Sequence, residues 1–273
     1  MKDEERKAYF DGLSKQYKVL EDLLRTIVFS FVDKKLRRIP PKGYPLYEIR
    51  DSILYRFGSL WFHMDLLLMM EQGIENYVTS KFPKLDVHDK GLLAYSRQQL
   101  HLFEDIIFHT ISIFDYMANL IGFLYLGNNK GKIKWNGISN AANDKNGIFK
   151  DTKAAELIRI YNKALVDLLY SYRSTLIHHT SETANATYTL RGTQTTIEGF
   201  YRVWCPDKFG KSLGKRLNLT IGSQNKQVTL VDIAACLIQD SANIVNELAQ
   251  SIKEEKELEW MANTQNWPGV GPR

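Results

Sequence analysis

The sequence predicts a mainly α protein, an antiparallel bundle of long helices with a small antiparallel β excursion between the last two helices. Three observations indicate this fold class. Apolar residues recur at alternating spacings of three and four along several long stretches, which is the pattern of helices with one buried face. Clusters rich in Pro, Gly and Asn interrupt these stretches. Near residues 186–230 the pattern changes to short β-prone runs separated by Gly-containing turns.

The composition is ordinary for a soluble globular protein. The chain has 273 residues and a mass of 31.6 kDa, with 44% hydrophobic and 25% charged residues. These values argue against a largely disordered, collagenous or low-complexity chain. Its two cysteines, Cys205 and Cys236, are too few for a disulfide scaffold or a four-cysteine zinc site. The formal net charge of +5 permits a nucleic-acid partner without requiring one.

Three long helices are expected in the first half of the chain. The first runs from about residue 3 to 38 and ends before Pro40-Pro41, because an apolar seam follows one helical face up to that point. The seam consists of Phe10, Leu13, Tyr17, Leu20, Leu24, Ile27 and Phe31. The second helix, over 47–82, is apolar enough to be buried on most sides. The third covers 92–126 and ends at Gly127.

Two further helices are expected in the second half. Residues 127–147 are rich in Gly, Asn and Lys and predict a loop. Asp151-Thr152 offers two good N-caps for a fourth helix, which ends near residue 178. The segment Thr229-Leu-Val-Asp232 resembles a capping box, so a final helix is expected from there to about Met261.

These elements predict one domain over residues 1–262. The N-terminal helices are expected to extend it, and the region near 186–230 is expected to be a β insertion. Residues 263–273 contain two Pro and two Gly, which indicates a flexible tail.

A cytoplasmic protein without a membrane partner is expected. The sequence opens on charged residues, where a secretory signal would place an apolar stretch soon after a basic start. The apolar stretch 106–126 is long enough to cross a bilayer. It contains His109, Asp115 and Asn119, and ionisable groups are costly in the membrane interior, so a buried core helix is the favoured interpretation.

One short motif carries most of the functional argument. Arg173 is followed by the polar Ser174 and, after four intervening residues, by His178, late in the amphipathic fourth helix. Arg56 and His63 satisfy a similar spacing, but Phe57 follows that arginine and the context is strongly apolar. The segment from Arg173 to His178 resembles the arginine-to-histidine motif of the HEPN superfamily. The resemblance covers residues 92–258, and Ser174 stands where that family most often has Asn.

The resemblance implies a metal-independent endoribonuclease that cleaves single-stranded RNA and needs no cofactor. In this interpretation His178 is the acid/base, since histidine exchanges protons near neutral pH. Arg173 holds the phosphate with its planar, always-charged donors, and Ser174 orients one of the two. Arg173 and His178 lie about 140° apart on an ideal helix, so the long arginine has to reach round it.

The family resemblance also implies partners. Two such motifs commonly meet across a homodimer, and relatives occur in toxin–antitoxin, stress and antiphage defence systems. A homodimer, RNA and a cognate antitoxin or other partner protein are therefore expected.

Basic residues outside the motif are candidate RNA contacts. Lys130, Lys132 and Lys134 precede Trp135, so this loop offers cations for a phosphate backbone and a ring on which a base can stack. His179 is a further candidate beside the motif. A second basic group consists of Lys208, Lys211, Lys215 and Arg216. Solvated loops explain both groups equally well.

Two alternatives use the same sequence differently. The first is a non-catalytic HEPN-like helical binding or interaction protein that keeps the fold and uses the motif helix as a surface. The second is a metal-dependent bundle enzyme, because His101, Asp105 and His109 recur at spacings of four. A metal site would also need a ligand from a facing helix, such as His63 or Asp65. No metal site is predicted, since one helix alone does not provide that convergence.

Overall fold

The computed structural model describes residues 3–36, 44–81, 84, 86, 89–127, 133–178, 186–192, 197–205, 207–217 and 228–265. Within these ranges it describes the backbone alone for residues 3, 36, 176–178, 188–192, 197–200, 207–208 and 257–265.

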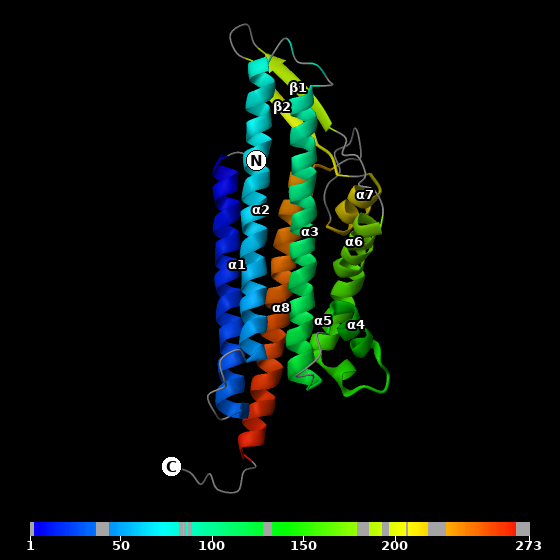
Figure 1. Cartoon of the computed structure of the whole chain (residues 1–273). Coiled ribbons are helices and arrows are strands. Elements are labelled where there is room, and N and C mark those ends of the chain that lie inside the picture. Colours follow the sequence, from blue (N-terminus) through cyan, green and yellow to red (C-terminus); the bar gives the residue numbers. More distant parts are fainter. Residues whose placement is uncertain are drawn as a thin grey trace. The chain divides into compact units, whose positions relative to one another are not determined.

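The structure confirms a mainly α fold with a two-stranded antiparallel sheet (Figure 1). The long helices are α1 (Asp3–Ser30), α2 (Pro45–Lys81), α3 (Lys90–Tyr125) and α8 (Leu230–Gln265). The shorter elements are η1 (Phe31–Leu36), α4 (Trp135–Asn143), η2 (Ile148–Asp151), α5 (Lys153–Tyr161), η3 (Asn162–Val166), α6 (Asp167–His178), β1 (Ala186–Gly192), β2 (Ile197–Val203) and α7 (Asp207–Arg216). Of these, η1 and η3 are π-helical turns and η2 is a 3₁₀ turn. Helices α4 and α7 were not predicted from the sequence.

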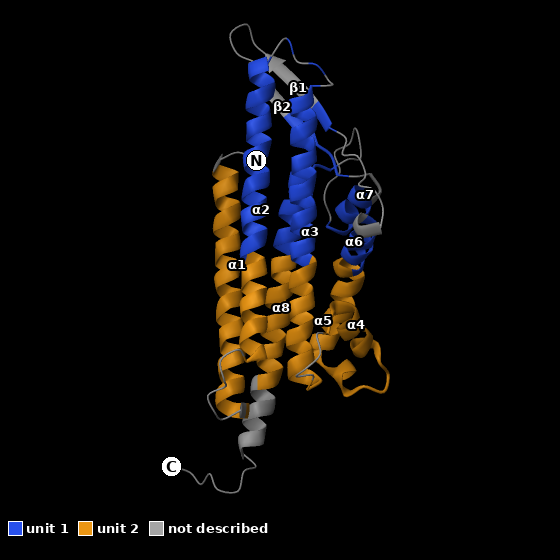
Figure 2. Ribbon diagram, in the orientation of Figure 1, with its two compact units in different colours: residues 1–3, 58–110, 167–240 blue, residues 4–57, 111–166, 241–273 orange. Residues whose placement is uncertain are grey.

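The chain forms two compact units whose segments alternate along the sequence (Figure 2). Unit 1 comprises 1–3, 58–110 and 167–240, and unit 2 comprises 4–57, 111–166 and 241–273. The chain therefore passes from one unit to the other inside α2, α3 and α8. The expectation of one domain over 1–262 stays a prediction.

Unit 2 is built around the apolar seam of α1. Leu13, Leu20, Leu24 and Ile27 are buried, as the spacing of three and four predicts. Polar contacts also join the helices of this unit, since Gln16 Nε2 on α1 donates to Asn243 Oδ1 on α8 at 2.6 Å. This bond gives the Gln16 amide donor a partner on a neighbouring helix of the same unit.

Unit 1 contains the motif helix α6, the hairpin and α7. In the hairpin Ala186 pairs with Val203 and Gly192 with Ile197. The N-cap half of the predicted capping box is present, because Thr229 Oγ1 accepts from the Asp232 backbone N–H at 3.1 Å. The Asp232 carboxylate accepts from the Thr229 hydroxyl at 2.6 Å, where a capping box would have it accept from the Thr229 backbone N–H.

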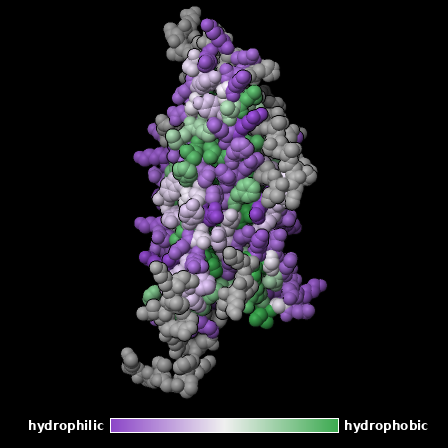
Figure 3. All heavy atoms as spheres, in the orientation of Figure 1, coloured by the Kyte–Doolittle hydropathy of each residue, from purple (hydrophilic) through white to green (hydrophobic). Residues whose placement is uncertain are grey.

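By length and composition helix α3 could cross a membrane, and 67% of its most apolar 18-residue stretch is buried inside the structure. This burial is compatible with the core helix of a soluble protein. Figure 3 shows mainly hydrophilic residues with smaller hydrophobic groups between them on the face that it draws.

Candidate functional site

The motif residues lie near the end of a nearly continuous helical path. Thr152 caps α5, because its hydroxyl accepts from the Ala155 backbone N–H at 3.1 Å, which confirms that N-cap. The π-helical turn η3 then inserts a wider turn before α6 begins at Asp167. Such turns shift the register of the residues that follow and are frequent at functional sites. The sequence pattern alone gave no sign of this turn.

Arg173 has an unusual environment in unit 1. Its guanidinium carbon lies 5.9 Å from the centroid of the Phe108 ring on α3, within the range of a cation–π contact. The side chain is half-buried, and its Nε is buried with no hydrogen-bond partner among the described residues. Buried donors in folded proteins are nearly always paired. Arg173 thus combines a partly accessible positive charge with one buried donor that no described residue satisfies.

The packing of Tyr172 fixes the orientation of Arg173. Tyr172 is buried and stacks on Phe209 of α7, with ring centroids 3.6 Å apart and planes 15° from parallel. Phe209 also packs near Phe103 on α3, with ring centroids 6.4 Å apart. Successive helical residues point about 100° apart, so the side of α6 next to this stack carries Arg173. Ser174 follows and is exposed.

The remaining motif residues are described only in part. His178 is the last residue of α6, and the structure describes its backbone alone. His179 lies outside the described residues. The meeting of the His178 and Arg173 side chains therefore stays a prediction.

The expected basic loop is different in the structure. Trp135 is fully buried at the start of α4 in unit 2, where its ring centroid lies 5.2 Å from that of Phe114. Its indole N–H donates to Asn162 Oδ1 and its backbone N–H to Asp115 Oδ1, both at 2.9 Å. A fully buried ring offers no face to a base, so the expected stacking role is incompatible with this position. The Gly, Asn and Lys residues before Trp135 predicted an exposed loop, whereas Trp135 is a core residue.

The lysines of that loop are less fully described. Lys134 is exposed and is the N-cap residue of α4. Lys130 and Lys132 lie outside the described residues. Their contact with RNA stays a prediction.

The facing-helix histidine considered for a metal site does approach α3. His63 Nε2 on α2 lies 3.7 Å from Asp105 Oδ2, and its ring centroid lies 4.9 Å from that of His109. His63 Nδ1 is 2.7 Å from the Ser59 carbonyl, so this nitrogen carries the proton. Within the described ranges, no group of three or more His, Cys, Asp or Glu side chains is placed to hold a metal ion.

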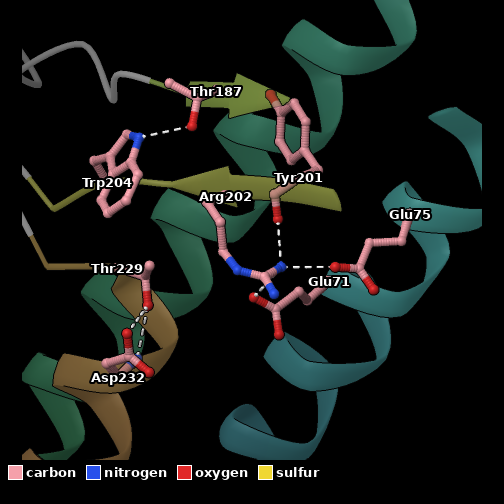
Figure 4. Close-up of polar contacts among 8 residues, drawn as sticks. All are labelled: Glu71, Glu75, Thr187, Tyr201, Arg202, Trp204, Thr229 and Asp232. Atoms are coloured by element: carbon pink, nitrogen blue, oxygen red, sulfur yellow. Dashed lines mark hydrogen bonds and ion pairs between the residues drawn. The ribbon is translucent and has the colours of Figure 1, made fainter. Parts of the chain in front are cut away.

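An ion-pair cluster in unit 1 joins the hairpin to α2 (Figure 4). Arg202 Nη1 on β2 donates to Glu75 Oε1 at 2.6 Å and lies 3.3 Å from Glu71 Oε1. Burial raises the pKa of Glu71, and Arg202 opposes that rise. The hydroxyl of the neighbouring Tyr201 makes a short hydrogen bond to Ser96 on α3.

Sequence analysis missed this cluster. A signal was present in the two glutamates spaced by four on α2, which share a helical face. Their partner lies 127 residues from Glu75, in a strand whose register no local pattern specified.

Comparisons of the chain with family models, with curated proteins and with solved structures find no match.

Proposed function

We propose that the chain is a HEPN-like, metal-independent endoribonuclease that cleaves single-stranded RNA. The observation that supports this most is Arg173, a partly accessible residue beside Phe108 whose buried Nε has no partner among the described residues. An arginine placed in this way suits an anionic acceptor, because charge-assisted hydrogen bonds strengthen where water is partly excluded.

The proposed reaction needs only proton transfer and charge stabilisation. A base takes the proton of a ribose 2′-hydroxyl, whose oxygen then bonds to the adjacent phosphorus. The bond from phosphorus to the 5′-oxygen breaks, and an acid gives that oxygen a proton. The products are a 2′,3′-cyclic phosphate and a 5′-hydroxyl.

The motif residues divide this work. His178 moves the proton, since imidazole exchanges protons near neutral pH. Arg173 donates to the phosphate oxygens as negative charge develops in the transition state. Ser174, which is exposed one residue after the arginine, orients the substrate or the arginine.

The proposed working unit is a cytoplasmic homodimer. A single motif supplies one histidine, whereas the reaction moves a proton at two oxygens, so a second copy would complete the acid/base pair. A cognate antitoxin or other partner protein would control the activity in a toxin–antitoxin, stress or antiphage defence role.

Matched substitutions test the assignment. Arg173→Ala should slow cleavage of single-stranded RNA in EDTA by about 10²–10³-fold, and His178→Ala by about 10²–10⁴-fold. Arg173→Lys keeps the charge and loses the planar fork, so its rate should fall between those of wild type and Arg173→Ala. Arg97→Ala and His101→Ala alter exposed residues of α3 and serve as controls.

The result also separates the two leading functions. Thermal melting of each variant shows whether a loss of rate reflects a loss of fold. Wild-type rates in both motif variants would refute the assignment. RNA or protein binding by a wild-type chain that cleaves nothing would instead favour the non-catalytic binding protein.

A further inference from the structure

Helix α7 has one face turned into unit 1 and one face turned to solvent. Phe209, Gly210, Leu213 and Gly214 are buried, with Phe209 6% and Leu213 0% exposed. Among the α7 side chains that the structure describes, the exposed ones are Lys211, Ser212, Lys215 and Arg216. Lys211 and Lys215 are spaced by four, as are Ser212 and Arg216, so each pair follows the same side of the helix.

Two contacts fix the orientation of α7 in unit 1. Phe209 is held against Tyr172 by the 3.6 Å ring stack. At Gly210, a Cβ atom would lie 3.0 Å from the Cβ of Cys205, so the absence of a side chain lets the helix approach that residue closely. The outward direction of the basic face is therefore set by packing. The same stack places α7 against α6, the helix that carries Arg173.

We propose that the exposed basic face of α7 binds the phosphate backbone of the RNA strand that the proposed nuclease cleaves. The inference rests on the proposed function and adds a substrate-binding surface to it. Cations repeated along one rigid helix face neutralise successive phosphates and release their counterions, which binds a strand without reading its sequence. Because Tyr172 joins α7 to α6, a strand on this face would lie beside the motif helix.

The chemistry of α7 favours a nucleic acid over a membrane surface. A helix that lies on a bilayer buries its apolar face among the lipids. In α7 that face is already occupied by packing inside unit 1. The exposed side chains that the structure describes on α7 carry three positive charges and one hydroxyl, which suits a flexible polyanion.

Equal charge removal at two places tests the inference. Lys211→Gln/Lys215→Gln is compared with Lys15→Gln/Lys18→Gln, which removes two exposed lysines from α1. Lysine and glutamine have similar helix propensities, so neither pair of changes should disturb its helix. The probe is a fluorescein-labelled 2′-O-methyl oligonucleotide, in which the attacking hydroxyl is blocked and binding is measured apart from cleavage. Fluorescence anisotropy titrations measure the binding constant at several KCl concentrations from about 50 to 200 mM, a range over which phosphate contacts weaken strongly with salt.

Loss of two phosphate contacts should weaken binding by the α7 variant about 25-fold at 100 mM KCl, which is one decade of salt below the 1 M reference state. The slope of log K against log salt should fall by about 1.4, which is about 0.7 for each contact with a single strand. The α1 variant should keep the wild-type affinity and slope.

Several results would overturn the inference. These are unchanged binding by the α7 variant, an equal loss in the α1 variant, or no binding by the wild-type chain. Selective loss of binding to phosphatidylcholine vesicles containing phosphatidylserine, with RNA binding intact, would show instead a membrane surface. Cleavage by wild type with unchanged binding by the α7 variant would overturn this inference alone. Binding that depends on α7 without any cleavage would overturn the proposed nuclease activity alone.

Discussion

Replacing Arg202 with methionine tests the ion-pair cluster that joins β2 to α2. Methionine has a similar length and lacks the charge, so the change removes the donors and keeps much of the packing volume. In the variant, Glu71 and Glu75 remain close together on one face of α2 without their cation. Their repulsion, and the burial of Glu71, should then oppose docking of the hairpin.

The expected loss of stability follows from the exposure of the three side chains. Removing one partner of a fully buried ion pair costs about 3–5 kcal/mol, whereas exposed pairs contribute at most about 1 kcal/mol. The Glu71 side chain is 11% exposed, that of Glu75 28% and that of Arg202 34%, so the cluster lies between these limits. We expect a loss of about 2–3 kcal/mol, which corresponds to a fall in Tm of about 4–12 °C.

Two measurements distinguish global from local effects. Urea unfolding gives the change in stability, and hydrogen exchange reports the opening of the β1 and β2 amides. Exchange at these amides should accelerate even if the global transition moves little, because local opening needs less free energy than complete unfolding. Arg97→Met, at an exposed position of α3, is the control. Equal stability and equal exchange in the two variants would refute a role for the cluster in docking the hairpin.

Three other predictions follow from single contacts. Burial raises the pKa of Glu71 above the ordinary value of 4.5, so its stabilising contribution is present below that pH and is lost as pH rises through the raised pKa. Glu71→Gln should therefore reduce the fall in stability as pH rises above 4.5, measured by urea titrations at a series of pH values, and a fall equal to that of the wild type would contradict this. Thr229→Ala should cost about 1 kcal/mol through loss of the cap on α8, with Thr229→Ser restoring most of it in thermal melts. Trp135→Phe leaves Asn162 without its indole donor and should cost about 1–3 kcal/mol, and a wild-type melting temperature would count against that bond.

The long helices were predictable because their information is local. The spacing of Leu13, Leu20 and Leu24 on α1 specifies a buried face without knowledge of what covers it. The N-caps Thr152 and Thr229 were predictable for the same reason, since an N-cap side chain bonds to a backbone N–H only three residues away.

The short helices were not predictable for the opposite reason. Helix α7 has Gly210 and Gly214 in its interior, which lower its intrinsic helical stability. Phe209 and Leu213 compensate by packing inside unit 1, and sequence periodicity over so short a segment does not reveal that packing. Trp135 was misjudged similarly, because the Gly and Lys residues before it predicted an exposed loop.

The candidate site was predictable as a set of residue types and not as a geometry. The motif specified Arg173, Ser174 and His178 by spacing alone. The cation–π contact with Phe108 and the unpartnered Nε depend on how α6 is rotated against α3. The stack of Tyr172 on Phe209 is one tertiary contact that holds α6 in place, and the motif spacing does not specify it.

The central claim is cleavage of RNA through its own 2′-hydroxyl without a metal ion. The most direct test incubates the purified full chain in EDTA with a single-stranded RNA and with its 2′-O-methyl counterpart, and identifies the ends of any products. The account predicts that the RNA is cut to fragments with 2′,3′-cyclic phosphate ends and that the 2′-O-methyl strand stays intact. Cleavage of the 2′-O-methyl strand, or RNA cleavage that appears only when a divalent metal is added, would contradict it.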